Sequence, residues 1–227
     1  MTQPSRLPGV ELSVDRSDAL AADESEQVHD LFAETYAQPN HEYLDKSLGC
    51  LRYIARARAG DRLVAFALAD SRFSELPGFD QSQLVLLGGI GCVRGEYRRS
   101  GLFSLLAGRA AHGSGLLGTN DDRLLACGRM AHPAGFRPLR RFSGVVPDTA
   151  KALSTWHLDV AAALARLYGA RLRAESLVVA GNGRPIGYPR IEIDIDAEEW
   201  LPFAGVDRDR GDSLLAFAWV PDAPPGW

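Results

Sequence analysis

The sequence predicts an α/β fold in which a central sheet is flanked by helices. An apolar run over residues 84–93 is typical of a buried strand, and a segment with leucines at helical spacing follows it at 101–111. Two strand-like segments, 50–58 and 63–72, precede this pair and indicate a hairpin. A long amphipathic segment over 149–168 predicts a further helix that enlarges the C-terminal part.

Length and composition limit the class of protein. A chain of 227 residues can bury a substantial core, and we expect one domain over 1–227, with a core at 9–146 and a C-terminal extension at 147–220. The hydrophobic content of 46% and charged content of 24% are typical of a soluble globular protein. No apolar run is long enough to cross a membrane, and residues 1–8 lack a signal-peptide core, so we expect a cytoplasmic protein.

Charge and cysteine content exclude two kinds of site. The net charge of -4 argues against general nucleic-acid binding, although local arginine clusters remain compatible with it. Cys50, Cys92 and Cys127 lack the spacing of a zinc site, and no HExxH motif or carboxylate dyad suggests a metal. We therefore expect reduced thiols and no metal.

Two elements are expected before the hairpin, after a loose terminus at 1–8. Residues 10–14 predict a first strand, and residues 23–36 predict an amphipathic helix with acidic residues near its start. Pro39 and Asn40 end this helix, so the chain is expected to continue as a loop.

The central part carries the strongest local signals. The turn at 59–61 (Ala-Gly-Asp) joins the two strands of the hairpin. Glycines at 88, 89 and 91 lie within the apolar strand and predict that another group approaches its backbone closely.

The sequence also predicts the elements that follow the central helix. A loop at 118–122 leads into a strand at 123–130, and Pro138 should kink the following segment or limit it to its first turn. Asn182-Gly183 predicts a hairpin. The last expected strands are 172–180, 188–195 and 213–220, followed by a loose tail at 221–227.

The turn after the central strand is the most specific chemical signal. Residues 93–103 are VRGEYRRSGLF, so Arg98, Arg99 and Ser100 precede Gly101 at the start of the helix. A strand, a basic turn and a helix N-terminus bring backbone N–H groups together where an anion can bind. The alternative is an ordinary strand-to-helix turn whose arginines are solvated.

This stretch resembles the acyl-CoA motif of the GNAT superfamily of N-acyltransferases. In that motif Arg or Gln is followed after two residues by Gly, and after one more by Gly or Ala. Arg98 and Gly101 match, whereas Phe103 stands where Gly or Ala is usual and Gly95 where proline is common. The resemblance implies that the residues in contact with the donor are Cys92, Val93, Arg98, Arg99, Ser100, Gly101, Leu102 and Phe103.

The resemblance also implies a fold and a reaction. The fold is a mixed, mostly antiparallel sheet that opens around its fourth and fifth strands to admit the pantetheine arm of the donor. The reaction moves an acyl group from a pantetheine thioester (acyl-CoA) to the amine of a small-molecule acceptor, with a backbone N–H near Cys92 or Val93 polarising the carbonyl. Tyr36, His41 and Glu42 would then contact the acceptor, and the alternative is that they belong to an ordinary surface loop.

One departure from the family concerns proton transfer. The family's usual Asn at the strand end falls on His132, and the Tyr that protonates the departing thiolate falls on Leu139. His132 is our candidate for proton transfer, because an unperturbed imidazole has a pKa of about 6.5. The alternative is a helix-capping or backbone-bonded histidine. Cys92 is either a nucleophile or, like most cysteines on an apolar strand, a packing residue.

Three functional classes stay open. The first is an acyltransferase that uses acyl-CoA. The second takes its acyl group from the phosphopantetheine of an acyl carrier protein in natural-product biosynthesis, and the third binds a ligand without turnover. In the second class an acidic partner would meet Arg94, Arg98, Arg99, Arg137, Arg140 and Arg141. The sequence leaves open the acyl group, the acceptor and whether the protein forms a homodimer.

Overall fold

The computed structural model describes residues 9–118 and 123–227. The predicted terminus at 1–8 and most of the predicted loop at 118–122 lie outside the described residues. The strands are β1 (Val10–Arg16), β2 (Tyr36–Ala37), β3 (Tyr53–Ala59), β4 (Arg62–Ser74), β5 (Gln83–Val93), β6 (Leu124–Met130), β7 (Val178–Val179), β8 (Tyr188–Pro189) and β9 (Ser213–Val220). The α-helices are α1 (Ala22–Thr35), α2 (His41–Cys50), α3 (Leu102–His112), α4 (Pro133–Arg140), α5 (Thr155–Leu167) and α6 (Ala197–Trp200).

The expected α/β class is confirmed. The main sheet is mixed and mostly antiparallel, with the strand order β1-β3-β4-β5-β6-β9-β7, and β2 and β8 form a separate pair. The described chain divides into two compact units. The first comprises residues up to Ser71 with 88–118 and 187–191, and the second comprises 72–87, 119–186 and 192–227. The expectation of a single domain remains a prediction.

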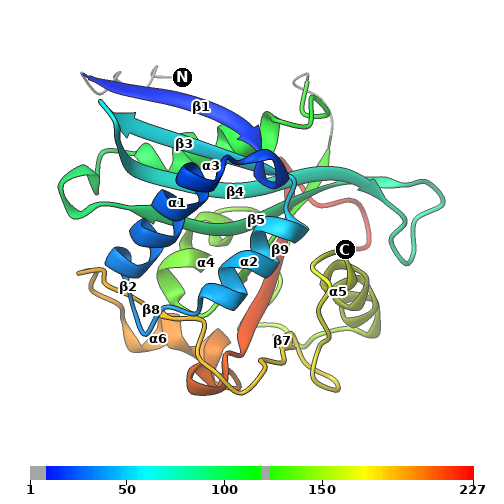
Figure 1. Cartoon of the computed structure of the whole chain (residues 1–227). Coiled ribbons are helices and arrows are strands. Elements are labelled where there is room, and N and C mark those ends of the chain that lie inside the picture. The colour runs from blue at the N-terminus through cyan, green and yellow to red at the C-terminus, as the bar shows by residue number, and fades with distance from the viewer. Residues whose placement is uncertain (1–8, 119–122) are drawn as a thin grey trace. The chain divides into compact units, whose positions relative to one another are not determined.

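The first unit is built on the three antiparallel strands β1, β3 and β4. The register runs from Val10 opposite Ala59 to Arg16 opposite Tyr53, and β3 pairs in turn with β4. Residues 54–57 of β3 are all buried, although neighbours in a strand point to opposite faces, so both faces of this part of the sheet are covered. In Figure 1, α1 lies in front of the strands, and α3 packs against β3.

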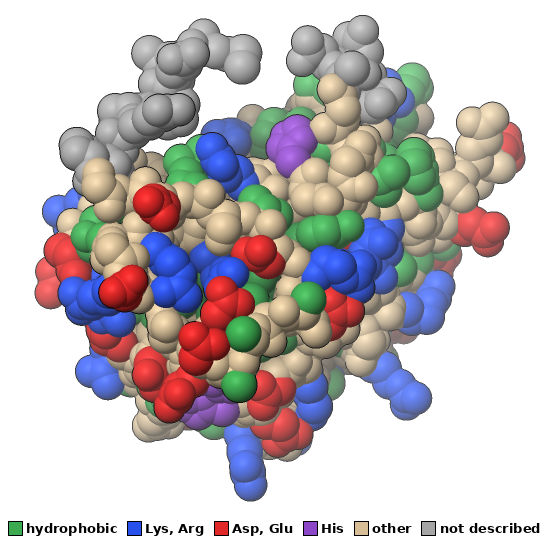
Figure 2. Space-filling model, turned by 45° about the horizontal axis from the view of Figure 1, so that its top comes forward, with side chains coloured by type: hydrophobic (Ala, Val, Ile, Leu, Met, Phe, Trp, Pro, Cys, Tyr) green, Lys and Arg blue, Asp and Glu red, His purple; other side chains and the backbone are tan. Residues whose placement is uncertain are grey.

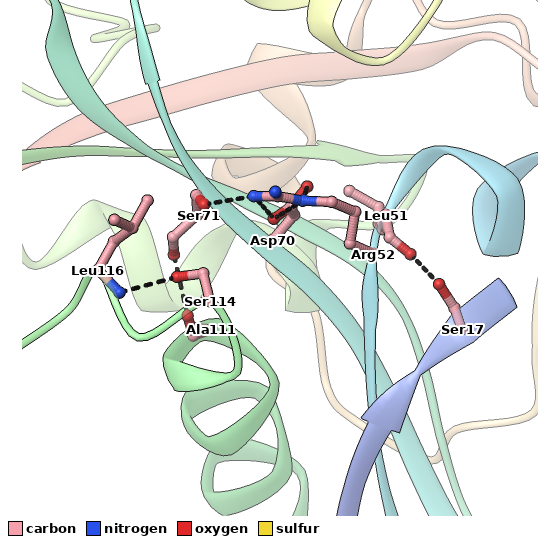
Figure 3. Close-up of polar contacts among 8 residues, drawn as sticks. All are labelled: Ser17, Leu51, Arg52, Asp70, Ser71, Ala111, Ser114 and Leu116. Atoms are coloured by element: carbon pink, nitrogen blue, oxygen red, sulfur yellow. Dashed lines mark hydrogen bonds and ion pairs between the residues drawn. The ribbon is translucent and has the colours of Figure 1, made fainter. Parts of the chain in front are cut away.

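A partly buried ion pair connects the residue before β3 with β4, and a further hydrogen bond connects β4 with α3 (Figure 3). Asp70 on β4 is fully buried, and its carboxylate accepts hydrogen bonds of 2.8 to 3.0 Å from Nε and Nη2 of Arg52. Nη2 of Arg52 also donates to the carbonyl of Ser71, whose own Oγ donates to the carbonyl of Ala111 at 3.0 Å. The same polar cluster therefore fixes the start of β3 and the end of α3 on β4.

The chain after Asn40 forms helix α2, so the expected loop was wrong. The side chain of Asn40 caps the helix by accepting a hydrogen bond from the backbone N–H of Tyr43 at 3.1 Å. Glu42 and Lys46 form an ion pair at a spacing of four residues, with 2.6 Å between Oε1 and Nζ. The first helix ends before Pro39, but the cap and the ion pair start a second helix directly after it.

The second unit is built on β6, β9 and β7. The pairing of β6 with β9 runs from Leu124 opposite Val220 to Met130 opposite Leu214, and β9 is buried at all but its last position. The predicted hairpin at Asn182-Gly183 was wrong, because only residues 178–179 form a strand on its N-terminal side and β8 pairs with β2 instead.

Two helices differ in length from the expectation. Helix α5 begins at Thr155, because the hydroxyl of Ser154 caps it by accepting a hydrogen bond from the backbone N–H of His157 at 3.1 Å. Helix α4 runs to Arg140 with Pro138 inside it, so the proline does not limit the segment to one turn. A proline there removes only one backbone donor from a short helix.

The C-terminal residues are packed, which corrects the expected loose tail. The ring of Trp227 lies 5.0 Å from that of Trp156 and 5.7 Å from that of Trp219, measured between centroids. Its Nε1–H donates to the carbonyl of Gly144 at 2.7 Å. An indole that buries its faces and satisfies its single donor holds the segment in place.

The surface is mixed in charge. Acidic and basic side chains are interspersed over the face shown in Figure 2. Among the described helices, none combines the length and the apolar character needed to cross a membrane.

Candidate functional site

The turn after β5 reverses the chain into α3. Residues 95–97 form a single 3₁₀ turn, closed by hydrogen bonds from Tyr97 N–H to the carbonyl of Arg94 (3.0 Å) and from Arg98 N–H to the carbonyl of Gly95 (3.2 Å). Arg99 and Gly101 then adopt positive φ angles of 63° and 79°. The left-handed conformation at position 101 explains the glycine of the motif, since most other residues are strained there.

The N-terminus of α3 is open to a ligand. Ser100 Oγ accepts a hydrogen bond from Leu102 N–H at 3.3 Å and donates to the carbonyl of Tyr97 at 2.6 Å. The next amides of the first turn have no intrahelical acceptor by the geometry of a helix, and no acidic residue lies in that turn. A Cβ atom at Gly95 or Gly101 would meet nothing within 4 Å. The turn therefore has both the donors and the space for an anion.

Arg94 fixes the end of β5 and does not face the turn. Its backbone N–H and its Nε donate to the carbonyls of Val64 and Leu63, each at 2.9 Å, and its guanidinium pairs with Glu34. Next to it is a hollow of about 170 Å³, lined by Gln27, Asp30, Asp61, Arg62, Leu63 and Arg94. Two carboxylates and two guanidinium groups face this hollow, so its charge does not favour an anion.

Arg98 is held in place by two backbone carbonyls. Its Nε donates to the carbonyl of Val93 at 3.0 Å, and its Nη1 donates to the carbonyl of Arg190. Arg190 belongs to the segment Gly187–Ile191, which lies within the first unit and which we call the strap. No local sequence pattern predicts this contact, because the two residues are 92 positions apart.

The structure brings Tyr36, Cys92 and Arg98 of the predicted site together. Burial raises the pKa of the Cys92 thiol to about 12, although a hydrogen bond with Thr35 and the charge of Arg98 both act to lower it. Burial also raises the pKa of Tyr36, with Cys92 and Tyr43 acting in the same direction and Arg98 opposing them. A thiol that stays protonated at neutral pH favours the packing interpretation of Cys92 over the nucleophilic one.

The predicted close approach to the glycines of β5 is confirmed. A Cβ atom at Gly89 would lie 2.2 Å from Cδ1 of Leu51, and one at Gly91 would lie 2.2 Å from Cε2 of Phe103. Phe103, which replaces the usual small residue of the motif, thus covers the backbone of the central strand although its side chain is exposed. Leu102 points into the core and is buried.

The other predicted acceptor contacts lie on α2. Glu42 is in the first turn and forms the ion pair with Lys46 described above. His41 Nδ1 lies 2.8 Å from Nδ1 of His29, and Nε2 of His29 lies 2.9 Å from Oδ1 of Asp45. These polar groups have partners within the protein, and contact with an acceptor remains a prediction for them.

His132 belongs to the second unit and caps α4. Its Nδ1 accepts a hydrogen bond from Ala134 N–H at 3.2 Å, which places the proton of the neutral ring on Nε2. Its ring meets that of Trp200 edge-on, with 5.5 Å between centroids. Burial lowers its pKa, as do the charges of Arg208 and Arg137. The ring is therefore neutral at neutral pH, and its capping contact is the one that the sequence left as the alternative.

The arginines after β6 are engaged within the second unit. Arg137 donates to both carboxylate oxygens of Glu199 at 2.7 Å and to the carbonyl of Asp194 at 2.6 Å. Arg140 lies 3.8 Å from the same carboxylate, and the guanidinium of Arg141 lies over the ring of Phe142 at 5.1 Å. No group of three or more potential metal ligands occurs in the described part of the chain.

Comparisons with known proteins give distant structural likenesses only. No protein-family model and no curated protein matches the chain. It is similar to the ribosomal-protein-S18-alanine N-acetyltransferase of Escherichia coli, with 11% identity, a TM-score of 0.44, and coverage of 96% of this chain and 99% of that one.

Two further likenesses are of the same kind. An acyl-CoA N-acyltransferase from Pseudomonas aeruginosa has 17% identity and a TM-score of 0.41, covering 65% of this chain and 93% of its own. The aminoglycoside N-acetyltransferase AAC(6')-Iy, in complex with CoA, has 16% identity and a TM-score of 0.39, covering 59% and 86%. Similarities at this level of identity do not identify a donor or an acceptor for this chain. The structures to which it is similar are GNAT-fold N-acyltransferases.

Proposed function

We propose that this protein is an N-acyltransferase that moves an acyl group from a pantetheine thioester, acyl-CoA, to the amine of a small molecule. The observation that carries the proposal is the turn between β5 and α3. There, Arg98 and the exposed first turn of a helix without acidic residues surround the left-handed Gly101. This arrangement suits the diphosphate of CoA, because backbone N–H groups and the positive end of the helix dipole stabilise negative charge.

The reaction requires few groups from the protein. The amine nitrogen attacks the thioester carbonyl, the C–S bond breaks, and the amine loses a proton while the thiolate gains one. A backbone N–H near Cys92 or Val93 would polarise the carbonyl, and the site would hold the two reactants at attack distance. Leu139 has no proton to donate, so the thiolate must receive its proton from another group or from water.

His132 is the proposed group for proton transfer. In the described geometry its Nε2–H is a donor, while the lone pair on Nδ1 is occupied by the cap of α4. A neutral imidazole with hydrogen on Nε2 can donate a hydrogen bond to the thiolate, or hold a water molecule that supplies the proton and is left as hydroxide to take the proton of the amine. Accepting the amine proton directly would require it to release Ala134 N–H.

A second candidate is a domain that binds the same donor without turnover. Two observations favour it: Leu139 occupies the position of the usual acid, and Phe103 lies over the backbone of Gly91. Both leave the anion-binding turn intact. Release of CoA from acetyl-CoA in the presence of amines separates the two candidates, because a binding domain gives none.

The test of donor binding uses two variants at one position. Gly101→Asp places a carboxylate against the donor phosphates, whereas Gly101→Asn has nearly the same shape without the charge. Both residues tolerate a left-handed conformation and can cap a helix, so the fold should survive in each. We expect calorimetry to show CoA binding lost in Gly101→Asp and retained, though weakened, in Gly101→Asn.

Two outcomes bear on the proposal differently. Equal CoA affinity in the wild type and Gly101→Asp would place any donor site elsewhere. If the wild type binds an acylated carrier protein but not acyl-CoA, the proposed reaction stands and only the donor differs, because both donors present the same pantetheine arm.

A further inference from the structure

We propose that the strap, Gly187–Ile191, is part of the donor site: the carbonyl of Arg190 positions the guanidinium of Arg98 for the anionic ligand. The strap and the donor then stabilise each other. This inference rests on the proposed function, since it assumes that the turn between β5 and α3 binds the phosphates of a pantetheine donor.

Backbone hydrogen bonds attach the strap to the end of α1. Residues 188–189 of β8 pair with residues 36–37 of β2, so that Tyr188 lies opposite Ala37 and Pro189 opposite Tyr36. Arg190 N–H donates to the carbonyl of Thr35 at 2.8 Å. In Figure 1, β2 and β8 lie side by side. The strap is thus fixed by the three consecutive residues Thr35, Tyr36 and Ala37.

Close packing sets the position of the strap as well. Gly187 has a φ angle of 130°, and a Cβ atom there would lie 3.1 Å from Cδ1 of Tyr36 and 3.5 Å from the Cα atom of Pro39. Only glycine suits this conformation, so the strap enters the first unit in direct contact with the Tyr36 ring.

The other side of the strap meets Arg98. Of the five N–H donors of its guanidinium, Nε bonds to the carbonyl of Val93 and one hydrogen of Nη1 bonds to the carbonyl of Arg190. These two acceptors come from β5 and from the strap, and they fix the plane of the guanidinium from two sides. Within residues 9–118 and 123–227, the Arg98 side chain makes these two hydrogen bonds, so the Nη2 edge of the fork is available for a ligand oxygen.

Fixing the arginine changes its affinity for a ligand. A flexible arginine loses side-chain entropy when it binds a phosphate, and an arginine already held in one rotamer loses less. Because coupling between two binding events is reciprocal, a donor bound to Arg98 must also stabilise the contact of Arg98 with the strap. The strap therefore acts on donor affinity through Arg98.

A matched pair of variants at position 190 tests this role. Arg190→Pro removes the backbone N–H that bonds to Thr35 and so detaches the strap. Arg190→Ala keeps that N–H and removes the same exposed side chain. We expect calorimetry to show CoA binding at least about fivefold weaker in Arg190→Pro, the low end of typical coupling, and close to wild type in Arg190→Ala.

A double-mutant cycle shows whether the effect passes through Arg98. In the Arg98→Ala background the strap has no guanidinium to position, so adding Arg190→Pro should weaken CoA binding no further. A second measurement needs no change in the strap. At saturating CoA, hydrogen exchange at the Arg190 amide should slow in the wild type and stay unchanged in Arg98→Ala.

The outcomes separate this inference from the proposed function. If the wild type binds neither CoA nor an acylated carrier protein, the proposed function fails and the strap's role falls with it. If the wild type binds CoA but Arg190→Pro and Arg190→Ala have equal affinities, only the strap's role is overturned. The strap's role is also overturned if the losses of CoA affinity in Arg98→Ala and Arg190→Pro add fully in the double mutant. It is overturned as well if CoA does not change the rate of hydrogen exchange at the Arg190 amide.

Discussion

The ring of Phe103 lies directly on the backbone of Gly91, so that a Cβ atom at position 91 would be 2.2 Å from Cε2 of the ring. The two residues belong to β5 and to the first turn of α3, on either side of the proposed anion-binding turn. A phenyl ring in this position at 103 leaves no room for a side chain at 91 unless the ring moves.

The first prediction concerns this pair. Gly91→Ala should destabilise the protein by about 1 kcal/mol, the low end for an overpacked site, because the exposed Phe103 ring can move aside. In the Phe103→Ala background the same change should cost almost nothing, because the obstacle is gone. Chemical denaturation of the four proteins measures both values. An equal cost in both backgrounds would mean that Phe103 is not what the new methyl group meets.

The second prediction concerns the ion pair in Figure 3. Asp70→Ala should lower the free energy of unfolding by about 2 to 3 kcal/mol. This is less than for a fully buried pair, because 41% of the Arg52 side chain is exposed and can regain water. Asp18→Ala is the control, since it breaks the exposed pair with Arg16, which solvent screens, and should cost much less. Similar losses in the two variants would contradict the role assigned to burial.

The third prediction follows from the pKa of Glu199. Hydrogen bonds from Arg137 lower this pKa from its ordinary value of 4.5 to about 2. The folded state thus holds the proton less tightly than the unfolded state, and the stabilisation is full above the unfolded pKa and lost as the pH falls toward 2. Glu199→Gln should therefore lower the melting temperature near pH 6, with a difference from wild type that shrinks below pH 4.5.

Glu198→Gln provides the control for that titration. Glu198 is an exposed neighbour on α6, so its replacement should leave the pH dependence of the melting temperature unchanged. A constant difference between Glu199→Gln and wild type across the acid range would show that the pair with Arg137 does not set the pKa.

The fourth prediction separates the two roles of His132. His132→Ala removes the cap of α4 and should cost about 1 kcal/mol, whereas His132→Asn keeps a capping side chain and should cost less. If the imidazole transfers a proton, both variants should lose about 10²-fold or more in turnover between pH 6 and 9. Full turnover in His132→Asn would show that the imidazole transfers no proton and that His132 acts only as the cap of α4.

The sequence predicted the elements whose signals are local. The apolar run of β5, the leucine spacing of α3 and the turn between β3 and β4 each lie within a dozen residues, and the structure has these elements close to their predicted bounds. Helix α2 was not predicted, because Pro39 indicates the end of a helix. Asn40 as a cap and the pair of Glu42 with Lys46 are nevertheless local signals for a helix.

Contacts between distant segments could not be predicted in the same way. Nothing near Tyr188 shows that it would pair with Ala37, and the Asn182-Gly183 signal pointed to a local hairpin instead. For the candidate site, the sequence predicted the turn between β5 and α3 but not the contact of Arg98 with Arg190. Such pairings depend on how the whole chain packs, and the local pattern of side chains does not encode them.

The strap also sets the order in which the site can form during synthesis. Arg98 leaves the ribosome 92 residues before Arg190. At typical elongation rates this interval lasts on the order of 5 to 20 s. During that time the turn between β5 and α3 exists without the carbonyl that completes the anchoring of its arginine. If this turn binds the donor as proposed, its full affinity cannot appear before residue 190 has been synthesised and placed.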